Sequence, residues 1–511
     1  MNSCLYAPIF LYLLERTPIM KNTIVSSIPQ DRLFTHEQID SLLFGVTGKT
    51  LGEVDKKGVI DEFVRTRPDR VVRGVAGDVI ELSVLGCQRD SRPEPDIWVD
   101  EVKTELKTTG LVSSKDDKSE YQPKEPLTIT GVSPDNLKSE SFEDSRFYHK
   151  IEHLLFVFYH YNLTRKVQNS GDYRGFPIVG HFFWNVSDEH LEQLRNDWLL
   201  VQGFVRQFQF TDEDERHKLK QNLLLIDYSS PQQPRFRFKR SFVSTIVDIF
   251  LKNRKLQSLP KRITRYSDID DKCHKFTEQY GGKSLKDICQ ELGIQIKGKD
   301  VCQHLIIKMF DSNVHSINQI RDFSEIGLLS KTIILTSDGK RTEDMKLFKV
   351  NFDEWCDPTT TFNEQGDTQG ELFESNYSQM YSYFSEQMFL FIVFEEPYKG
   401  NNIPLEECKF KGFKRYTFNE HFINNDVRET WEEVRRLVLK KELVEVKKGR
   451  GISPNFPKSS DNIVFLRGSG VNSLDKRKIL KNWGIDMDMY YQHVWIRGDY
   501  IVSQLKDIPY L

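Results

Sequence analysis

The sequence is poor in cysteine and in net charge, and each shortage excludes a class of protein. The seven cysteines are odd in number, scattered along 511 residues and never arranged as CxxC, so we expect neither a disulfide framework nor a zinc site. A formal net charge of -3 argues against indiscriminate binding of polyanions, so contacts with nucleic acid would have to come from local basic patches. Segments of low complexity are also missing, and a content of 38% apolar residues is typical of a globular protein.

Long apolar segments are missing too. The most apolar terminal stretch, residues 4–14, is interrupted by Pro8 and is shorter than the roughly 20 residues that a transmembrane helix requires. It also lacks the basic region and the small-residue cleavage site of a signal peptide. We therefore expect a cytoplasmic protein without a membrane partner. Because Met20 is an alternative start, residues 1–19 are expected to be an extension that is either non-native or disordered.

The length of the chain predicts two domains, because a single hydrophobic core stops growing beyond about 250–300 residues. An internal repeat supports this division. Its first landmark is Gly48–Val54 (GKTLGEV), which returns as Gly282–Ile288 (GKSLKDI). Three further pairs follow in the same order: Arg73-Gly74 and Lys107-Thr108 with Lys297-Gly298 and Lys331-Thr332, Phe147–Phe158 with Tyr383–Phe394, and Lys239–Ile246 with Arg497–Gln504.

One such match would be expected by chance in any α/β chain, but four collinear matches favour a duplication. The runs Phe147–Phe158 and Tyr383–Phe394 have the length and composition of buried strands. The boundary is predicted in the polar stretch 259–272, which we interpret as a linker. The first domain would then cover residues 20–258 and the second residues 273–511.

A helix and two strands are predicted in the middle of the first domain. Apolar residues recur at helical spacing from Val75 to Leu82, and Gly86 is a suitable residue to end that helix. A short strand over residues 95–99 and a turn follow. A second strand is predicted over residues 102–109, where side chains of the two faces alternate strictly.

Acidic and basic side chains are brought together by these elements. The alternation puts Glu105 and Lys107 on one side of the second strand, next to Asp96 on its neighbour. Two carboxylates and an amine at one place suit phosphodiester hydrolysis, because oxygen ligands hold Mg²⁺ and the lysine can orient or activate the attacking water. Glu81 on the helix would extend the acidic cluster, as a metal ligand or through a bound water. Lys150, just before the apolar run, is a candidate for a second phosphate-facing amine.

Alone, this pattern is common and is equally typical of a solvated edge strand with ion pairs. The second copy favours the metal site over the solvated strand, because aliphatic residues stand there in place of the acids. At a constant offset of 224 residues, Ile320, Leu329 and Leu305 stand for Asp96, Glu105 and Glu81, and Lys331 stands for Lys107. At the offset of the two aromatic-rich runs, Glu386 stands for Lys150. Unpaired buried carboxylates are costly, so a metal site that has lost its function is expected to lose its acids together.

These residues resemble the MutH mismatch-repair endonuclease and its two-domain restriction-enzyme relatives, which belong to the PD-(D/E)xK nuclease superfamily. The shared motifs span about the first half of the chain and are Gly48–Glu53, Gly74-x-x-Gly77-x-x-x-Glu81, Glu94-Pro95-Asp96, Glu105–Thr108, Phe142-Glu143-x-Ser145, His149-Lys150 and Phe238–Ile246. The resemblance implies an α/β fold of two restriction-endonuclease-like domains. Each would be a mixed β-sheet flanked by helices, with the second domain a degenerate copy of the first.

The resemblance also implies a role for each residue. Asp96, Glu105 and Lys107 would be the core catalytic residues, supported by Glu81 and Lys150, with Mg²⁺ held by the three acids. The activity would be that of a type II restriction endonuclease that cuts double-stranded DNA at GATC. The second domain would bind a second copy of the DNA as an allosteric effector. A DNA methyltransferase that acts on the same site would be the functional partner, without direct contact.

Basic patches supply candidate DNA contacts. Residues 234–240 interleave cations with aromatic rings ahead of an apolar, helix-like run over residues 242–251, which would suit phosphate and base-edge contacts. A strand with one solvated basic face is an equally good interpretation of these residues alone. The candidate contacts, including one at the counterpart in the second copy, are Arg235, Arg237, Lys239, Arg240 and Arg497. The basic stretch 440–450 is a weaker candidate, because charge runs usually mark a solvated surface.

Two other functions stay open. A MutH-like nickase recruited by repair partners would cut one strand and would need no duplicated domain. A DNA-binding protein without catalysis belongs to another class, and the intact set of Asp96, Glu105 and Lys107 argues against it.

Overall fold

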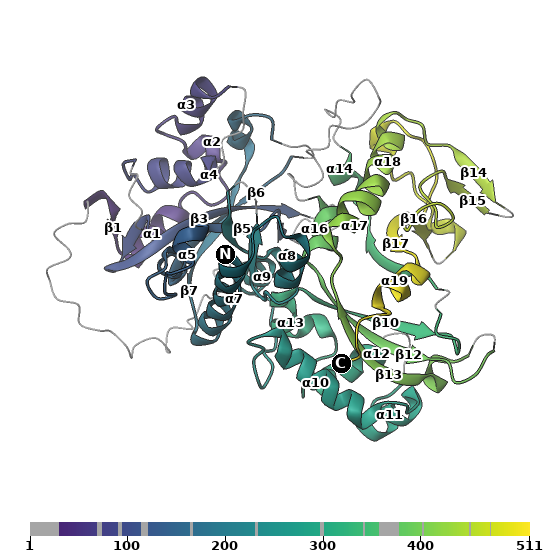
Figure 1. Ribbon diagram of the computed structural model, residues 1–511. Helices are drawn as coiled ribbons and strands as arrows, with labels where there is room; N and C mark the ends of the chain where they lie inside the picture. Colours follow the sequence, from purple (N-terminus) through teal and green to yellow (C-terminus); the bar gives the residue numbers. More distant parts are fainter. Residues whose placement is uncertain are drawn as a thin grey trace, which may run out of the picture.

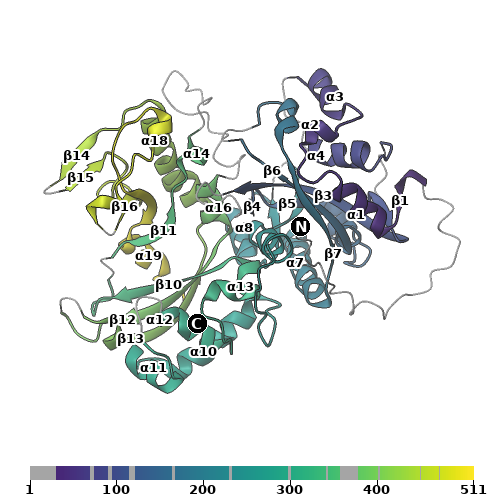
Figure 2. The ribbon, with the colours of Figure 1, turned by 180° about the vertical axis from the view of Figure 1, so that it is seen from behind.

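The computed structural model describes residues 30–68, 74–89, 95–113, 121–163, 167–229, 233–296, 301–340, 343–356, 378–400, 403–448, 451–470 and 472–511. The predictions made for residues 1–19, Met20, Arg73, Glu94 and Lys297-Gly298 lie outside these residues. Below, the first half is the part up to residue 258 and the second half is the part from residue 259. The two halves lie side by side in both ribbon views (Figure 1 and Figure 2). Among the described residues, no helix combines the length and the apolar character that crossing a bilayer would demand.

A mixed six-stranded sheet forms the centre of the first half. Its order is β1-β2-β3-β6-β7, with β4 paired to β3, and its strands are β1 (Leu33–Phe34), β2 (Ile97–Val99), β3 (Val102–Ser113), β4 (Tyr121–Pro123), β6 (His153–His160) and β7 (Ile178–Asn185). Strand β3 is antiparallel to β2 and parallel to β6. The two predicted strands are therefore confirmed as β2 and β3. Asp100 and Glu101 form the turn between them, both with positive φ (47° and 66°).

Helices and a smaller sheet cover the two faces of this sheet. The helices are α1 (His36–Phe44), α2 (Leu51–Val54), α3 (Val59–Thr66), α4 (Val75–Asp78), α5 (Pro134–Leu137), α6 (Arg146–Ile151), α7 (Asp188–Gln207), α8 (Glu213–Lys220) and α9 (Arg240–Ile246). The smaller sheet has the order β5 (Leu127–Gly131), β9 (Arg235–Phe238), β8 (Ile226–Ser229). Because side chains alternate along β6, Leu155 and Val157 pack with α1 to α4, whereas Phe156 and Phe158 pack with α7, α9 and the smaller sheet.

The predicted helix that carries Glu81 is confirmed as α4 and a π-helical continuation over Val79–Val84. Gly74 begins it with a φ of +90°, and Gly86 follows it with a φ of +84°. These are left-handed conformations that glycine adopts without a steric penalty. The helical run predicted after residue 242 is likewise confirmed, as α9 and a further π-helical segment Val247–Leu251.

The second half contains two three-stranded sheets and a hairpin. The sheets are β10 (Leu328–Leu335), β12 (Met388–Glu395), β13 (Lys409–Tyr416) and β11 (Met345–Lys349), β17 (Tyr491–Ile496), β16 (Val464–Ser469), and the hairpin is β14 (Glu445–Lys448) with β15 (Gly451–Pro454). The helices are α10 (Tyr266–Tyr280), α11 (Leu285–Leu292), α12 (Val301–Met309), α13 (Arg321–Ile326), α14 (Phe352–Trp355), α16 (Gln379–Glu386), α17 (Glu420–Phe422), α18 (Arg428–Leu439) and α19 (Gly498–Leu505).

The repeated segments that begin at Gly48 and Gly282 have the same backbone environment. Both glycines have a positive φ (84° and 81°), and both segments enter a helix through a capping hydroxyl, of Thr50 and of Ser284. The corresponding hydrogen bonds are Gly48 N to Ile178 O (2.8 Å) and Gly282 N to Phe410 O (2.7 Å), then Leu51 N to Phe176 O (2.9 Å) and Leu285 N to Cys408 O (3.0 Å). The likeness in sequence is therefore also a likeness in structure.

The main strands of the two halves are arranged alike. Strand β3 is parallel to β6, which is antiparallel to β7, and β10 is parallel to β12, which is antiparallel to β13. Both antiparallel pairs shift register at the same point, after Phe158 in the first half and after Val393 in the second. The smaller sheets β5-β9-β8 and β11-β17-β16 also share one order of pairing. Positions in the two halves can therefore be compared strand by strand.

The prediction that residues 147–158 and 383–394 are strands throughout is wrong. The first run begins in α6 and ends in β6, and the second begins in α16 and ends in β12. Ser145 and Ser378 cap these helices, because their hydroxyls accept hydrogen bonds from the third residue of the helix. The apolar run therefore combines the buried face of a helix with a buried strand.

The register of the strands changes the predicted counterpart of Lys150 in the second half. Lys107 lies opposite Phe156, and Lys331 lies opposite Phe391. Counted back along each chain from these two phenylalanines, the position of Lys150 corresponds to Ser385 rather than to Glu386. The sequence offset was one residue off at this point.

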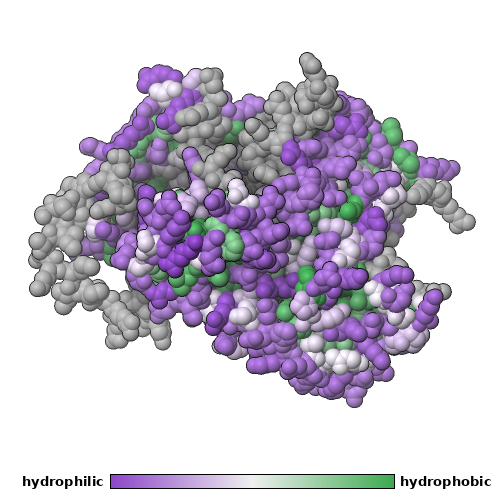
Figure 3. All heavy atoms as spheres, in the orientation of Figure 1, coloured by the Kyte–Doolittle hydropathy of each residue, from purple (hydrophilic) through white to green (hydrophobic). Residues whose placement is uncertain are grey.

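One hydrophobic core extends through both halves. Its buried side chains run from β6, α7 and β9 in the first half to α10, α12, α13 and β13 in the second. The stretch 259–272, predicted as a linker, contributes buried Leu259 and Ile263 to that core and enters α10 at Tyr266. The apolar patches on the face seen in Figure 3 are small and separated, which agrees with apolar side chains gathered inside.

A buried group of charges also joins the two halves. Glu325 on α13 is 1% exposed, and its carboxylate pairs with His190 of α7 (3.0 Å) and with Arg262 (2.8 Å). The hydroxyl of Ser241 on α9 donates to the main-chain carbonyl of Glu325 (2.9 Å). Burial opposes ionisation of Glu325, but His190 and the two neighbouring arginines outweigh it and lower the pKa of Glu325 to about 2.

Candidate active site

Glu105 on β3 is the centre of a buried charged cluster. The carboxylate is 1% exposed, and its Oε1 accepts hydrogen bonds from the amine of Lys107 (2.6 Å) and from the amine of Lys150. Lys107 is two residues further along β3 and therefore projects from the same side. Lys150 reaches Glu105 because α6 ends just before β6, the parallel neighbour of β3. The predicted convergence of these three residues is present in the structure.

Asp96 lies immediately before β2 and beside Glu105. Its Oδ2 accepts a hydrogen bond from the backbone N–H of Leu106 (2.9 Å), which holds the carboxylate against β3. Burial raises the pKa of Asp96 to about 6, and the negative charge of Glu105 is the next cause of this rise. The amines of Lys107 and Lys150 act in the opposite direction. The predicted pair of neighbouring carboxylates is therefore present.

Glu81 is paired with an arginine that the sequence did not predict. Its Oε1 accepts a hydrogen bond from the guanidinium of Arg32 (2.9 Å). The same guanidinium donates to the main-chain carbonyls of Gln88 (2.6 Å) and of Asp96. Glu81 is still near enough to contribute to the raised pKa of Asp96, although its carboxylate is engaged by Arg32.

Asp96 and Glu105 are suitable oxygen ligands for a divalent cation. No group of three His, Cys, Asp or Glu side chains that could hold a metal is found among the described residues, so Glu81 does not complete such a set here. The second oxygen of Glu105, Oε2, is buried without a hydrogen-bond partner. That oxygen has acceptor capacity to spare, and burial together with the charge of Glu105 disfavours the ionised form of Asp96, so a hard cation would satisfy the first and stabilise the second. The residues fit Mg²⁺, which usually binds one or two carboxylates and retains several waters.

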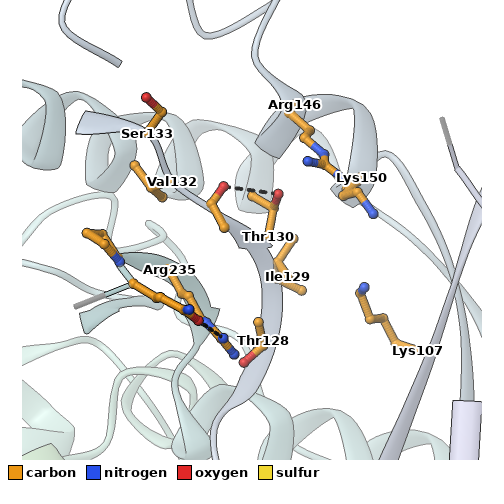
Figure 4. Close-up of a pocket in the computed structure, with 12 residues that line it drawn as sticks. Lys107, Thr128, Ile129, Thr130, Val132, Ser133, Arg146, Lys150 and Arg235 are labelled. Atoms are coloured by element: carbon orange, nitrogen blue, oxygen red, sulfur yellow. Dashed lines mark hydrogen bonds between the residues drawn. The ribbon is translucent and has the colours of Figure 1, made fainter. Parts of the chain in front are cut away.

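A pocket of about 710 Å³ opens above this cluster. Figure 4 shows the amines of Lys107 and Lys150 directed into one space, opposite Thr128 of β5 and Arg235 of β9. Arg146 also lines the pocket from the first turn of α6. The walls therefore carry four cations, which suits a polyanionic ligand such as a nucleic-acid backbone.

The predicted DNA contacts on and after β9 are not equally placed. Arg235 lines the pocket. Arg237 forms a hydrogen bond to Asp227 of β8 (2.8 Å from its Nε), so that its charge is already paired. Lys239 is 9% exposed, donates to the main-chain carbonyl of Leu223 and has its pKa lowered by burial. Of these three residues, only Arg235 lies where a ligand of the pocket would meet it.

The remaining predicted contacts also have partners within the protein. Arg240 donates to the main-chain carbonyl of Pro123 (2.7 Å), and Arg497 pairs with Asp499 (3.0 Å). Arg146, in contrast, was missed by the sequence analysis although it lines the pocket. Its position four residues before Lys150 on one helix was a usable signal, because such residues share a helix face.

The corresponding strand of the second half keeps the lysine and lacks the carboxylates. The amine of Lys331 on β10 donates to the main-chain carbonyl of Lys346 (3.1 Å). Leu305 is completely buried, and Leu329 packs against the second-half hydrophobic cluster that includes Phe389 and Phe391. Ile320 is also completely buried, but it precedes helix α13 rather than a strand, so the predicted correspondence with Asp96 before β2 is wrong. Burial lowers the pKa of Lys331, and the charge of Lys346 lowers it further. This region can present positive charge, but these positions offer no oxygen ligand.

The sheet β11-β17-β16 presents cations and aromatic rings on one face. We call this the outer basic face, and its members are Lys346, Lys349, Arg467, Tyr491, His493 and Trp495. His493 and Trp495 are two residues apart on β17 and therefore share that face. The guanidinium of Arg467 lies 4.7 Å from the ring centroid of Trp495, and the amine of Lys349 lies 3.8 Å from that of Tyr491. Such interleaving is typical of surfaces that bind nucleic acids.

Comparison with known proteins found one family match, within the first half. Residues 85–197 match the family model of the DNA mismatch repair enzyme MutH. No curated protein matches the chain. The matched segment contains Asp96, Glu105, Lys107 and Lys150, whereas Glu81 precedes it and Arg235 follows it. The match supports a MutH-like nuclease with a restriction-endonuclease-like fold, and such a nuclease binds DNA.

Proposed function

We propose, with the MutH match of residues 85–197 as the premise, that the protein is a Mg²⁺-dependent endonuclease that cleaves double-stranded DNA. The observation that carries this proposal is the buried Glu105, which has one unpartnered oxygen and whose other oxygen accepts hydrogen bonds from Lys107 and Lys150, the two lysines that line the pocket together with Arg146 and Arg235. Acidic ligands below and basic side chains above are the arrangement that a phosphodiester and a divalent cation require together.

In this proposal the residues of the first half divide the work. Asp96 and Glu105 would hold the cation, which when bound would supply positive charge against the charge that develops on the phosphate. The amine of Lys107 orients the attacking water and favours its deprotonated form. Lys150 and Arg146, on one face of α6, bind non-bridging oxygens of the scissile phosphate, and Arg235 binds the backbone from the opposite wall.

More specifically, we propose a type II restriction endonuclease that acts at GATC, with a methyltransferase of the same specificity as its functional partner. The alternative activity is that of a MutH-like nickase. Incubation of supercoiled plasmid with the full chain and Mg²⁺ separates them, because a restriction enzyme gives linear DNA whereas a nickase stops at the open circle. Sequencing of the ends identifies the target, and a plasmid that stays supercoiled would favour a DNA-binding protein without catalysis.

We also propose that the second half binds a second DNA duplex and activates the first half. The outer basic face supports this role, since it occupies in the second half the place that the pocket wall with Arg235 occupies in the first. One of its cations, Arg467, is partly offset by Asp344 (2.7 Å). Plasmids with two sites should then be cut faster than plasmids with one, and a short duplex added in trans should accelerate cleavage of the slow substrate.

A further inference from the structure

Arg32 is the most densely bonded cation beside the active site. It is 6% exposed, lies immediately before β1, and donates to the carboxylate of Glu81 (2.9 Å) and to the carbonyl of Gln88 (2.6 Å). Its third acceptor is the main-chain carbonyl of Asp96 itself. One side chain thus connects the helix of Glu81 with the backbone of a residue placed in the active site.

The neighbouring residue strengthens this connection. The carboxylate of Asp31 accepts a hydrogen bond from the backbone N–H of Gln88 (2.8 Å), and its carbonyl accepts one from the thiol of Cys87 (3.4 Å). Residues 31 and 32 therefore hold the chain both before and after the segment 90–94, which lies outside the described residues. The entry of the chain into β2 is fixed from both sides.

Strand pairing explains how Arg32 reaches this place. β1 is parallel to β2, with Leu33 opposite Trp98 and Phe34 opposite Val99. The residue before β1 therefore lies level with the residues that precede Trp98, among them Asp96. A guanidinium is a planar fork with several N–H donors, so it can serve three acceptors at once, which a lysine amine on a flexible stem cannot do in the same geometry.

From this geometry we infer that Arg32 is a positioning residue with two effects on the metal site. It fixes the backbone of Asp96 so that the carboxylate faces Glu105, and it binds Glu81 so that this acid does not act as a ligand. Under this inference the chain offers the cation two carboxylates rather than three. The inference rests on the proposed nuclease function, and it replaces the expectation from the sequence that Glu81 is a metal ligand.

The test measures metal binding apart from catalysis. Mn²⁺ is titrated into the full chain without DNA, and free Mn²⁺ is followed by electron paramagnetic resonance. In the natural background, Glu81→Gln should change the Mn²⁺ dissociation constant by less than about threefold, because Glu81 is held by Arg32. In the Arg32→Met background, which frees Glu81, the same substitution should weaken binding roughly 10-fold or more. Equal effects in the two backgrounds would overturn the restraint on Glu81.

A second measurement tests the effect on Asp96. Arg32→Met should lower the maximal single-turnover cleavage rate roughly 10- to 100-fold, while affinity for a duplex measured with Ca²⁺ stays within about threefold. Arg32→Lys keeps the charge and most of the stem, so it should recover folding but only part of the rate. Cleavage by Arg32→Met at the natural rate would overturn the positioning role.

The matched control is Arg89→Met. Arg89 lies next to Gln88 and also makes an arginine–carboxylate pair, with both oxygens of Glu62 (2.7 Å and 2.8 Å), but that pair is exposed and does not contact Asp96 or Glu81. This variant should bind Mn²⁺ and cleave as the natural chain does. If the natural chain neither cleaves DNA nor binds Mn²⁺, the nuclease proposal fails. If it does both and Arg32→Met behaves identically, only the inference about Arg32 fails.

Discussion

Lys107 on β3 and Lys331 on β10 occupy corresponding positions in the two halves, but their amines have different hydrogen-bond partners. Lys107 bonds to the carboxylate of Glu105, whereas Lys331 bonds to a main-chain carbonyl of Lys346, with Leu329 at the place of the acid. The strand arrangement tolerates both. The comparison teaches that one strand arrangement accommodates a lysine beside a buried acid in the first half and beside an aliphatic residue in the second half.

The largest effect is expected at the position where the two halves differ most. Glu105→Gln should lower single-turnover cleavage with Mg²⁺ by about 10³-fold or more, because several kcal/mol of charge stabilisation are lost with the ligand. Duplex affinity should persist, since removal of an acid lessens repulsion of phosphate. Leu329→Ala, the matching change in the second half, should leave the chemical step intact. Near-normal cleavage by Glu105→Gln would show that the active site lies elsewhere.

The two lysines offer the next test. Lys107→Ala should reduce the single-turnover rate by about 10²- to 10⁴-fold and duplex affinity only a few-fold, because an amine on the attacking water acts mainly in the transition state. Lys331→Ala should not change that rate on a substrate with one site. The rates are measured by quenched-flow assay. An equal loss of single-turnover rate in both variants would contradict the proposal that only the first half carries out cleavage.

The outer basic face supplies a smaller effect. Lys346→Glu combined with Lys349→Glu should remove the acceleration of cleavage by a second site, a factor of roughly 5–150 in coupled systems. Cleavage of a one-site plasmid should be unaffected. The control reverses two exposed charges of α10 and α11 in the same half, Lys275→Glu with Lys286→Glu, and should keep the acceleration. Retained acceleration in the first pair would assign effector binding to another surface.

The smallest effect concerns protonation of Asp96. Its pKa in the folded protein is about 6, above the ordinary value of 3.8, so the folded state retains a proton that the unfolded state releases. The stabilising contribution is complete below about pH 4 and is lost as the pH rises through about 6. In chemical denaturation without metal, Asp96→Asn should therefore lose less stability than the natural chain between pH 4 and 6. Identical pH profiles would mean that Asp96 ionises normally.

Local periodicity was sufficient to predict that Asp96, Glu105 and Lys107 lie close together. Alternation along β3 put Glu105 and Lys107 on one side, and the short strand before it brought Asp96 alongside; both features depend only on neighbours within about ten residues. The helix of Glu81 followed from its apolar spacing and its terminal glycine. Contacts between residues close together in the sequence are the ones that periodicity can predict.

Long-range pairing accounts for what was missed. Arg32 lies 64 residues from Asp96 in sequence, and only the parallel pairing of β1 with β2 brings them together. The basic segment at β9 was interpreted from its composition, yet Arg237 is paired with Asp227 because β8 happens to be its neighbour in the sheet. The apolar runs were assigned to strands because composition does not distinguish a buried helix face from a buried strand.

The core that extends through both halves has a consequence for the substrate. Two halves joined by a common core and by the buried pairing of Glu325 with His190 cannot turn freely about one another, so two bound duplexes would be presented at a fixed mutual angle. DNA is stiff over about 150 base pairs, so two nearby sites on one molecule must meet that angle through the twist of the segment between them. Looped cleavage would then rise and fall with the spacing of the sites, with a period of roughly 10.5 base pairs, the helical repeat of the double helix.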